Sequence, residues 1–406
     1  MGTAGKRRIV VVGGGPAGVF AAIEAKRTDP TAEVTLLTDE PCEPYEKPPL
    51  SKGVLTGKAL PEHALTAGRN GIAAHKVVLE CGTCCTGIDR AAREVVTSGR
   101  RFPYDALVLA PGSINRELPQ WPAGMPRVHY LRSEKEARAL KSALAPGKQL
   151  VIVGGGLIGL EVAASAVTLG VKTTVLEVGQ RILARVCDEE TCTFVADTHR
   201  RHGVDLHTGE MIEHVRTHDT GIDIETKSGK RFTADVVVVG AGVKPNVALA
   251  AAAGLEISDG IVVDEHSRTS DPAIFAAGDA VRFPGPEGPI RMENWRHAQD
   301  HGMVAGRNAA GAAETYKSLP SFWSEQYDLY IQGIGWPSAR PRPRVHRTVE
   351  GGRPLVFELA DGTIGYAMGI NVQRDLAVVR RLIERKVPVD AAALADPGRP
   401  LQAMLG

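Results

Sequence analysis

The sequence predicts an α/β protein built from two copies of a strand, glycine turn and helix, with a smaller α+β domain at its C-terminal end. The copies are RIVVVGGGPAGVFAAIEA at residues 8–25 and QLVIVGGGLIGLEVAASA at residues 149–166. In each copy a β-branched run enters a G-x-G-x-x-G turn and a small-residue helix leaves it, which is the pattern of a parallel β-sheet unit. At 406 residues the chain exceeds one ordinary domain and suggests two or three.

Composition narrows the class of protein further. Lys and Arg number 48 against 47 Asp and Glu, so the formal net charge of +1 argues against a broad nucleic-acid-binding surface. The start, MGTAGKRRIVVVGGG, passes from a short basic tail directly into a strand, and no apolar run has the length of a membrane span. We therefore expect a cytoplasmic protein without a membrane or nucleic-acid partner.

The first glycine turn contains Gly13, Gly15 and Gly18, with Pro16 and Ala17 opening the helix. Glycines at this spacing permit a tight turn, a close approach of backbone to a pyrophosphate and tight packing of helix on strand. The helix N-terminus adds a favourable dipole for the phosphate charge. These residues predict a dinucleotide site in a Rossmann-like domain.

The second turn repeats the pattern with Gly154, Gly156 and Gly159, and Leu157 and Ile158 open its helix. One such match alone is a weak signal, but two copies in the same strand, turn and helix context make a chance origin improbable. The chain is therefore expected to bind two dinucleotides.

The residues that follow each second strand indicate which dinucleotide is bound. Glu177 ends KTTVLE about 20 residues beyond the second turn, where a carboxylate accepts hydrogen bonds from an adenosine ribose and repels a 2′-phosphate. NADH is therefore favoured over NADPH; nearby Arg181 and Arg185 are interpreted as solvated helix charges. After the first turn, EVTLLTDE offers Asp39 or Glu40 for the ribose, and the sequence does not choose between them.

A later stretch assigns the first site to FAD. TSDPAIFAAGDAV, residues 269–281, resembles the late flavin-binding motif of flavoproteins with two dinucleotide sites, and ends its strand on Gly278 and Asp279. YDALVLAPGS, which contains Ala110, and FTADVVVVGAGVKPN, which contains Gly242, mark where the chain leaves and re-enters the first domain. The expected division is 1–114 and 246–320 for the FAD domain, 115–245 for the NAD domain and 321–406 for the C-terminal domain.

Together with YEKPPLSK, RMENWRHA and FWSEQYD, these motifs resemble the FAD-dependent NADH:ferredoxin reductases of the putidaredoxin reductase and biphenyl dioxygenase reductase type. The resemblance covers nearly the whole chain and implies a glutathione-reductase-like fold. It implies hydride transfer from NADH to FAD, then electron delivery to a small acidic iron–sulfur ferredoxin that serves a cytochrome P450 or a ring-hydroxylating oxygenase. Rubredoxin reductases and apoptosis-inducing factor share much of the pattern, so rubredoxin stays open as the partner.

The resemblance also implies roles for single residues. Lys52 is expected beside the flavin N5 edge, paired with Glu161; a structural ion pair between domains is the alternative for both. Lys47 stands where the family often has arginine and implies a single-point FAD contact. Trp295 is expected near the pyrimidine end of the flavin, and Trp323 either near the nicotinamide or in the core.

Two rival functions remain open. An NADH-dependent disulfide or oxygen reductase needs a catalytic cysteine, and among six cysteines only Cys42 lies near the expected cofactor loop. We interpret all six as scattered reduced thiols. A signalling flavoprotein similar to apoptosis-inducing factor is the second rival. No metal site is expected, and the sequence does not indicate an oligomeric state.

A basic stretch, SARPRPRVHR, follows the FWSEQYD motif. It places Arg340, Arg342, Arg344 and Arg347 on an expected strand, where they form either a docking patch for an acidic ferredoxin or the charged surface of an edge strand.

Overall fold

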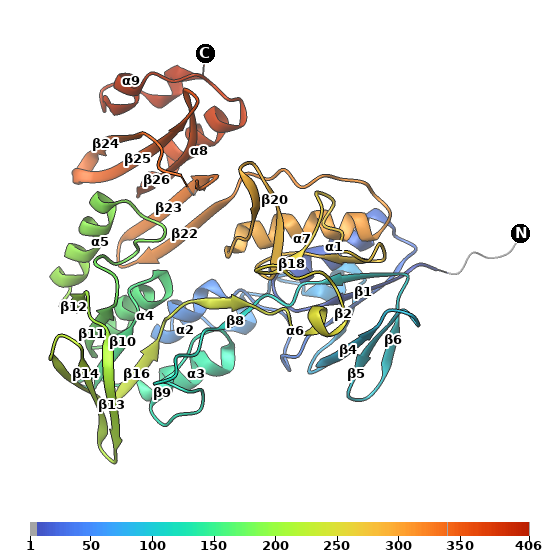
Figure 1. The fold of residues 1–406 in the computed structure, drawn as a ribbon, viewed down its shortest axis with the longest axis horizontal. Coiled ribbons are helices and arrows are strands. Elements are labelled where there is room, and N and C mark those ends of the chain that lie inside the picture. The colour runs from blue at the N-terminus through green and yellow to red at the C-terminus, as the bar shows by residue number, and fades with distance from the viewer. Residues whose placement is uncertain (1–5, 339, 406) are drawn as a thin grey trace, which may run out of the picture. The chain divides into compact units, whose positions relative to one another are not determined.

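The structure is a computed structural model that describes residues 6–338 and 340–405 and divides the chain into two compact units (Figure 1). The first unit combines residues 1–46, 61–114 and 243–318, and the second combines residues 47–60, 115–242 and 319–406. Each unit is thus assembled from segments that are distant in the sequence. The division into four domain segments stays a prediction. In the described part of the chain, every helix is too short or too polar to cross a membrane.

A five-stranded parallel sheet organises the first unit, in the order β19-β7-β1-β2-β3. Val10 of β1 pairs with Thr35 of β2 on one side and with Leu107 of β7 on the other. The central strands are almost continuously apolar because a parallel sheet is covered on both faces. The strands are β1 (Arg8–Val12), β2 (Glu33–Leu37), β3 (Val78–Glu80), β7 (Ala106–Leu109) and β19 (Ile274–Ala276).

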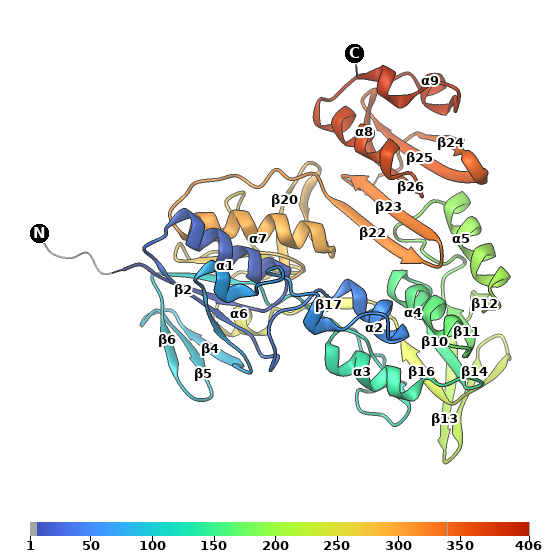
Figure 2. The same cartoon turned by 180° about the vertical axis from the view of Figure 1, so that it is seen from behind.

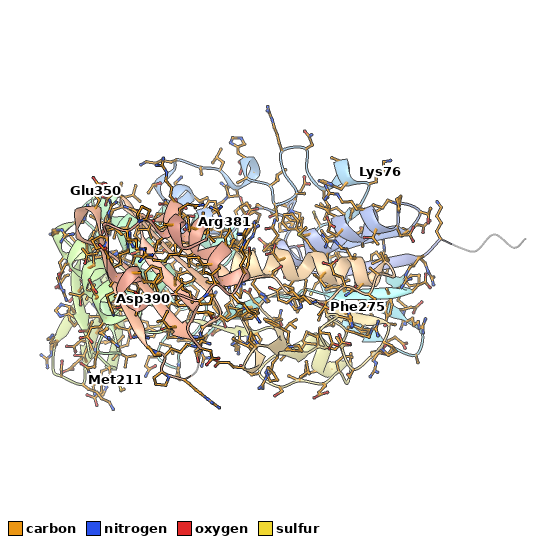
Figure 3. The ribbon with its side chains drawn as sticks, turned by 90° about the horizontal axis from the view of Figure 1, so that it is seen from above. Lys76, Met211, Phe275, Glu350, Arg381 and Asp390 are labelled. Atoms are coloured by element: carbon orange, nitrogen blue, oxygen red, sulfur yellow. The ribbon has the colours of Figure 1, made fainter. Side chains whose placement is uncertain are left out.

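Two helices of the first unit, α1 (Pro16–Thr28) and α7 (Trp295–Ala309), lie side by side in both Figure 1 and Figure 2. A Cβ on Gly302 would lie 2.2 Å from the carbonyl oxygen of Ala17, so only glycine allows this close an approach of the two backbones. Phe275 of β19, labelled in Figure 3, belongs to the buried core that these helices share with the sheet.

Smaller elements complete the first unit. An antiparallel sheet contains β4 (Cys85–Asp89), β5 (Glu94–Thr97) and β6 (Arg101–Pro103). A mixed sheet contains β18 (Ile261–Val262), β20 (Val281–Gly285) and β21 (Gly288–Ile290), with β18 parallel and β21 antiparallel to β20. β8 (Ser113–Asn115) pairs with β17 (Val243–Pro245) where the chain leaves and re-enters the unit. The remaining helices are α6 (Ala248–Ala252), η2 (Pro61–His63) and η3 (Ile72–His75).

The second unit contains a matching parallel sheet in the order β12-β11-β10-β16-β9. Its strands are β9 (Val128–His129), β10 (Gln149–Val153), β11 (Lys172–Glu177), β12 (Asp205–Thr208) and β16 (Val236–Val239). An antiparallel sheet of β13 (Ile212–His218), β14 (Gly221–Thr226) and β15 (Arg231–Ala234) lies next to it in the chain. The helices are η1 (Pro48–Ser51), α2 (Gly53–Thr56), α3 (Glu134–Ala143), α4 (Leu157–Thr168) and α5 (Glu189–Arg201).

The C-terminal part of the second unit is an antiparallel sheet, β22-β23-β26-β25-β24, packed against α8. Its core includes Phe357, Val379 and Leu382, which are buried between sheet and helix. The elements are β22 (Ser321–Gln326), β23 (Leu329–Gly335), β24 (Arg344–Val349), η4 (Glu350–Gly352), β25 (Arg353–Ala360), β26 (Thr363–Ile370), α8 (Gln373–Glu384), α9 (Ala391–Ala395) and η5 (Leu401–Met404). This segregated arrangement of strands and helices agrees with the predicted α+β domain.

Candidate active site

The first glycine turn has the geometry of a dinucleotide site. Gly13 has a φ of +120°, and a Cβ there would lie 2.0 Å from the carbonyl oxygen of Ala110 on the neighbouring strand end. A Cβ on Gly18 would lie 1.9 Å from the carbonyl oxygen of Gly13. These two glycines are therefore required by the turn and by the packing of α1 on β1.

The middle glycine of this turn differs from its neighbours. A Cβ on Gly15 would meet no heavy atom within 4 Å in the described parts of the chain. Gly15 caps α1 without a side-chain hydrogen bond, and Pro16 and Ala17 follow it. Open space thus adjoins Gly15 at the N-terminus of α1, the positive end of the helix dipole, which fits a pyrophosphate group.

The late flavin-type motif lies beside this turn. Gly278 has a φ of +84°, and a Cβ there would be 2.8 Å from the Cβ of Ala17 at the start of α1. The next residue, Asp279, accepts a hydrogen bond from the Ser113 hydroxyl at 3.1 Å. The structure therefore brings residues 278–279 to the glycine turn, although more than 250 residues separate the two motifs in the sequence.

The two carboxylates proposed for the FAD ribose have different surroundings. Asp39 is exposed, whereas Glu40 is half-buried and accepts a hydrogen bond from the Tyr45 hydroxyl. The preceding residue, Thr38, is buried below the turn, where its Oγ1 would lie 2.5 Å from a Cβ on Gly14. The choice between Asp39 and Glu40 stays a prediction.

Trp295 is the first residue of α7, whose N-cap Asn294 accepts a hydrogen bond from the backbone N–H of His297. Its ring meets Phe20 of α1 edge to face, with centroids 6.2 Å apart. Its indole lies near Glu46, whose pKa is raised by burial. These contacts give Trp295 a structural role, and a contact with the flavin stays a prediction.

The second glycine turn repeats the first. Gly154 has a φ of +109°, and a Cβ there would lie 2.5 Å from the carbonyl oxygen of Gly240; a Cβ on Gly159 would lie 2.3 Å from that of Gly154. A Cβ on Gly156, like one on Gly15, would meet no heavy atom within 4 Å in the described parts of the chain. Leu157 and Ile158 open α4, which like α1 begins without a side-chain cap. Gly242 has a φ of +90° and its carbonyl accepts a hydrogen bond from the backbone of Arg116.

Glu177 is tied to this second turn. One carboxylate oxygen accepts the Gly155 N–H at 2.6 Å and the other accepts the Gly179 N–H at 2.7 Å. These bonds hold a negative charge beside the turn, and its predicted role in opposing a 2′-phosphate stays a prediction. Arg181 pairs with the exposed Glu189 and is solvated, as predicted, but it lies in the loop before α5 and not in a helix.

The Lys52 and Glu161 side chains meet within the second unit. Lys52 Nζ lies 3.1 Å from Glu161 Oε2, which also accepts a hydrogen bond from the Ser51 hydroxyl. The other oxygen, Oε1, accepts the Ser324 hydroxyl at 2.6 Å. Glu161 is only 6% exposed, so its charge depends on these three donors. Ser51 and Ser324 were missed from sequence, although both stand inside motifs that carry the family resemblance.

Lys47 and Trp323 belong to the same unit as this ion pair. Lys47 precedes η1 and is half-buried. Trp323 is half-buried on β22, where it pairs across the sheet with Gln332. Their predicted roles toward FAD and NADH stay predictions.

All six cysteines are free thiols in the described chain. Burial raises the pKa of Cys85 to about 12, and burial also raises the pKa of Cys81. Cys81 donates its thiol hydrogen to the backbone carbonyl of Cys42 at 3.2 Å. The Cys192 thiol likewise lies 3.6 Å from the carbonyl oxygen of Cys187. These backbone contacts agree with the interpretation of reduced, structural thiols.

The basic stretch does not form the expected run of four exposed arginines. β24 begins only at Arg344, which pairs with Glu358 at 2.8 Å, so Arg340 and Arg342 precede the strand. Arg347 is buried and donates to the carbonyl oxygens of Leu394, Pro397 and Arg399, at 3.3, 3.2 and 2.9 Å respectively. The docking-patch interpretation was wrong for Arg347, since its guanidinium holds the C-terminal segment in place.

β24 also meets α5 through a small charged cluster. His346 Nδ1 lies 2.7 Å from Glu190 and 3.7 Å from Asp188, the N-cap of α5. The ligand atoms of the three residues lie within 4.8 Å of one another, as in a metal site. Asp188 already accepts the backbone N–H of Thr191, and Glu190 is hydrogen-bonded to His346, so contacts between strand and helix account for the cluster.

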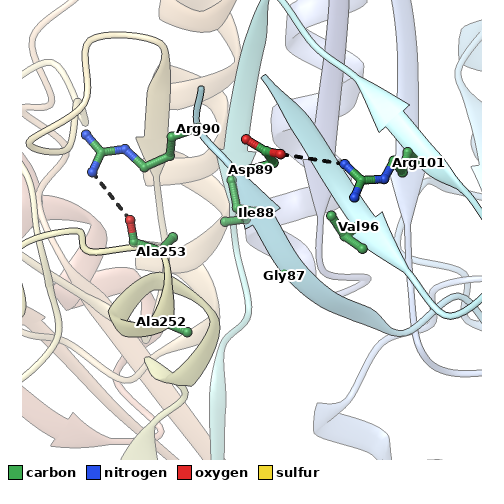
Figure 4. A pocket seen from close by; sticks show the side chains of 8 residues that line it. All are labelled: Gly87, Ile88, Asp89, Arg90, Val96, Arg101, Ala252 and Ala253. Atoms are coloured by element: carbon green, nitrogen blue, oxygen red, sulfur yellow. Dashed lines mark hydrogen bonds and ion pairs between the residues drawn. The ribbon is translucent and has the colours of Figure 1, made fainter. Parts of the chain in front are cut away.

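A shallow pocket in the first unit is lined by β4, β5 and the end of α6 (Figure 4). Its arginines already have acidic partners. Arg101 lies 3.6 Å from Asp89 and 2.9 Å from Glu94, and Arg90 lies 2.7 Å from Asp271. Arg90 also donates to the carbonyl oxygen of Ala253 at 3.3 Å. Because none of the glycine-turn residues lines it, this pocket is not a candidate for the dinucleotide sites.

Comparisons with known proteins agree with this geometry. Residues 7–302 match the pyridine nucleotide-disulphide oxidoreductase family, and residues 321–405 match the reductase C-terminal family. The chain is 35% identical to rhodocoxin reductase of Rhodococcus erythropolis, over 96% of this chain and 92% of that protein. It is 36% identical to the ferredoxin–NAD(+) reductase component of the p-cumate 2,3-dioxygenase system of Pseudomonas putida, over 97% and 98%.

A solved structure, of the covalent putidaredoxin reductase–putidaredoxin complex, has a TM-score of 0.92 and 32% identity, covering 98% of both chains. The fold class predicted from the sequence is thereby confirmed. The chain belongs to the pyridine nucleotide-disulphide oxidoreductase family, in the group of flavin-dependent ferredoxin reductases that the sequence resembles.

Proposed function

We propose that this protein is an NADH:ferredoxin oxidoreductase that passes electrons from NADH through FAD to a small iron–sulfur ferredoxin. The observation that carries the proposal is the duplicated glycine turn, in which Gly15 and Gly156 each face open space in front of an uncapped helix. Two such sites in one chain fit one dinucleotide cofactor and one dinucleotide substrate. Relatives named as ferredoxin–NAD(+) reductase components support this function over rubredoxin reductase and disulfide reductase.

The FAD and NADH sites are assigned to separate residue sets. We assign FAD to Gly13, Gly15, Pro16, Ala17, Gly18, Asp39 or Glu40, Lys47, Ala110, Gly278, Asp279 and Trp295. We assign NADH to Gly154, Gly156, Leu157, Ile158, Gly159, Glu177, Gly242 and Trp323. When bound, FAD supplies the chemistry that links a two-electron hydride donor to a one-electron acceptor.

Lys52 and Glu161 form the proposed catalytic pair. The Lys52 ammonium would offset the negative charge that a reduced flavin gains, and Glu161 holds that ammonium at 3.1 Å. Glu161 needs its serine donors because a buried carboxylate with one partner is poorly stabilised. Glu161 and its serine donors thus hold the Lys52 ammonium in a fixed position and keep it from turning toward solvent.

The partner is proposed to be an acidic ferredoxin of a cytochrome P450 or ring-hydroxylating oxygenase system. The relatives include rhodocoxin, putidaredoxin and terpredoxin reductases as well as reductase components of dioxygenase systems, which supports this class of acceptor. We also propose a cytoplasmic location, which suits the reduced state inferred for the six cysteines. The boundaries 1–114, 115–245, 246–320 and 321–406 are proposed for the domains.

The test is an anaerobic titration of the purified FAD-loaded protein with NADH, followed by addition of an oxidised ferredoxin of the putidaredoxin type. We expect uptake of two electrons per FAD and then NADH-driven reduction of the ferredoxin. Uptake of four electrons, abolished by Cys42→Ser, would instead support the disulfide reductase. Full flavin reduction by NADH without delivery to any ferredoxin or rubredoxin would favour the signalling flavoprotein.

A further inference from the structure

A continuous chain of hydrogen bonds runs through the second unit and ends on Glu161. The Tyr327 hydroxyl lies 3.3 Å from His199 Nδ1, and His199 Nε2 lies 2.8 Å from Gln326 Oε1. Gln326 Nε2 donates to the Ser324 hydroxyl oxygen at 3.1 Å, and that hydroxyl donates to Glu161 Oε1 at 2.6 Å. Four consecutive hydrogen bonds therefore join Tyr327 to Glu161 of the proposed catalytic pair.

The chemistry of these groups fixes the direction of the chain. Gln326 Oε1 can only accept, so the proton of His199 must be on Nε2, and Nδ1 is left to accept from Tyr327. The Ser324 oxygen receives the Gln326 N–H and gives its own hydrogen to the carboxylate. Every donor thus points toward Glu161, and hydrogen bonds aligned in one direction polarise and strengthen one another.

Burial keeps the chain in this arrangement. His199, Gln326 and Ser324 are fully buried, so water does not compete for their hydrogen bonds. Burial also lowers the pKa of His199 to about 4, which leaves the ring neutral with a single N–H at physiological pH. A protonated ring would carry two donors, and its Nδ1 could no longer accept from Tyr327.

The outer end of the chain is held by a tight turn. Tyr327 lies in the two-residue turn between β22 and β23 and has a φ of +56°, a conformation that costs energy for a residue with a side chain. Its ring stacks on His202 of the segment that follows α5, with centroids 3.8 Å apart. The strained turn therefore places the hydroxyl against His199 rather than in solvent.

We propose that His199 and Gln326 are positioning residues that act through Ser324 to orient the Glu161 carboxylate, and thereby hold Lys52 for hydride transfer. This role rests on the proposed function of the pair. An amide side chain does not readily pass a proton along, so the chain orients Glu161 and does not conduct protons. Lys52 and Ser51 approach Oε2 while the chain fixes Oε1, so the carboxylate is fixed at both oxygens.

The first measurement is the tautomer of His199 in the FAD-loaded protein labelled with ¹⁵N-histidine. Nitrogen chemical shifts distinguish the two ring tautomers, and the His199 signals are identified by their loss in His199→Asn. We expect a neutral ring protonated on Nε2 at pH 7. A ring protonated on Nδ1 or on both nitrogens would overturn the proposed direction, and this result is independent of enzymatic activity.

The second measurement separates orientation from folding. Gln326→Glu keeps the shape of the side chain but removes the N–H donor and offers Ser324 a second carboxylate. In rapid-mixing experiments at saturating NADH we expect flavin reduction to slow by about tenfold, the scale of a modest misplacement of a catalytic group. The dissociation constant of NADH should stay within about twofold, because no NADH-site residue changes.

Two further variants keep this test decisive if Gln326→Glu folds poorly. His199→Leu removes the donor to Gln326, whereas His199→Gln keeps a donor at that position and should recover most of the rate. Thr168→Val serves as the control and should keep the wild-type rate, since the Thr168 hydroxyl lies on the same helix as Glu161 but donates to the backbone carbonyl of Ala164 at 2.9 Å. Equal rates for His199→Leu and His199→Gln would show that packing alone matters and would overturn the proposal.

The outcomes also separate this inference from the proposed function. If the wild type reduces its flavin with NADH and Gln326→Glu matches it, the orienting chain is wrong and the reductase function stands. If the wild type does not react with NADH, the reductase function is wrong and the chain has no role in hydride transfer.

Discussion

Lys52 Nζ lies 3.1 Å from Glu161 Oε2, although the two residues are 109 positions apart in the chain. The lysine follows η1 directly, and the glutamate lies in the second turn of α4. Their side chains are 20% and 8% exposed, so neither charge is fully solvated. Removing one partner therefore leaves a poorly solvated charge without its counter-charge, whereas removing both does not.

We predict that Lys52→Met slows flavin reduction by NADH by at least about tenfold and lowers stability by about 3 kcal/mol, because it leaves a buried carboxylate unpaired. The double variant Lys52→Met, Glu161→Gln should regain most of the stability but not the rate. Rapid-mixing kinetics and thermal melts measure the two effects. Lys148→Met is the control, since it breaks the more exposed Lys148–Asp235 pair and should cost under about 1 kcal/mol. Recovery of the full rate in the double variant would argue for a purely structural ion pair.

The glycine turns give a prediction that separates folding from binding. Gly13→Ala should fail to give stable protein, because its Cβ would overlap the carbonyl oxygen of Ala110 at 2.0 Å. Gly15→Ala should fold, since Gly15 has a φ of −79° and open space at its Cβ, but its methyl group should weaken FAD binding by about tenfold or more. Melts of the apoprotein and FAD content after dialysis measure these effects.

The second turn supplies the matched test. Gly156→Ala should keep FAD and the stability of the wild type while raising the KM for NADH, because Gly156 also has open space at its Cβ. If Gly156→Ala lost FAD instead, the assignment of the two sites would be reversed.

These glycines also show which features the sequence could predict. Strands, glycine turns and the carboxylate at Glu177 follow from local patterns, because the spacing along one segment determines which groups reach the turn. The donors Ser51 and Ser324 could not be predicted, because they reach Glu161 from segments 110 and 163 residues away. Arg347 was wrongly grouped with the other arginines of the basic stretch. Side chains alternate between the two faces of a strand, so Arg344 faces solvent whereas Arg347, three residues later, faces the core.

We predict that Glu177→Gln lowers kcat/KM for NADH by about tenfold. It should also decrease the ratio of kcat/KM for NADH to that for NADPH. The amide cannot accept both the Gly155 and Gly179 N–H groups, and it no longer repels a 2′-phosphate. Steady-state kinetics with both coenzymes measure the ratio. Asp205→Asn, at an exposed carboxylate of β12, should leave the ratio unchanged. An unaltered ratio in Glu177→Gln would remove this residue from coenzyme selection.

Arg347→Ala should destabilise the C-terminal sheet by about 3 kcal/mol, because three backbone carbonyl oxygens lose the buried guanidinium that donates to them. Arg344→Ala, at the rim of the same strand, should cost under about 1 kcal/mol because its pair with Glu358 is half-exposed. Thermal melts and limited proteolysis of residues 391–405 compare the two variants. Equal losses of stability in the two variants would mean that the buried contacts of Arg347 stabilise the protein no more than the Arg344–Glu358 pair does.

Stability should also fall in mild acid because of buried neutral histidines. Burial lowers the pKa of His297 to about 3 and that of His199 to about 4, against 6.5 for an unburied histidine. Above pH 6.5 each ring is neutral in both the folded and the unfolded chain, so it contributes no pH dependence. Below pH 6.5 the unfolded chain binds protons that the folded chain does not, so stability decreases until the folded pKa is reached.

The expected loss for His199 alone is about 3 kcal/mol between pH 6.5 and pH 4, because one pKa unit corresponds to about 1.4 kcal/mol. His297 adds a further loss over the same range, and its Nδ1 is held 2.7 Å from the Tyr316 hydroxyl in the neutral form. Melting temperatures measured from pH 7.5 to pH 4.5 should fall steadily, and His297→Leu should flatten the curve even if it lowers the value at pH 7.5. A curve of unchanged slope in His297→Leu would mean that this ring is protonated in the folded protein or that water reaches it.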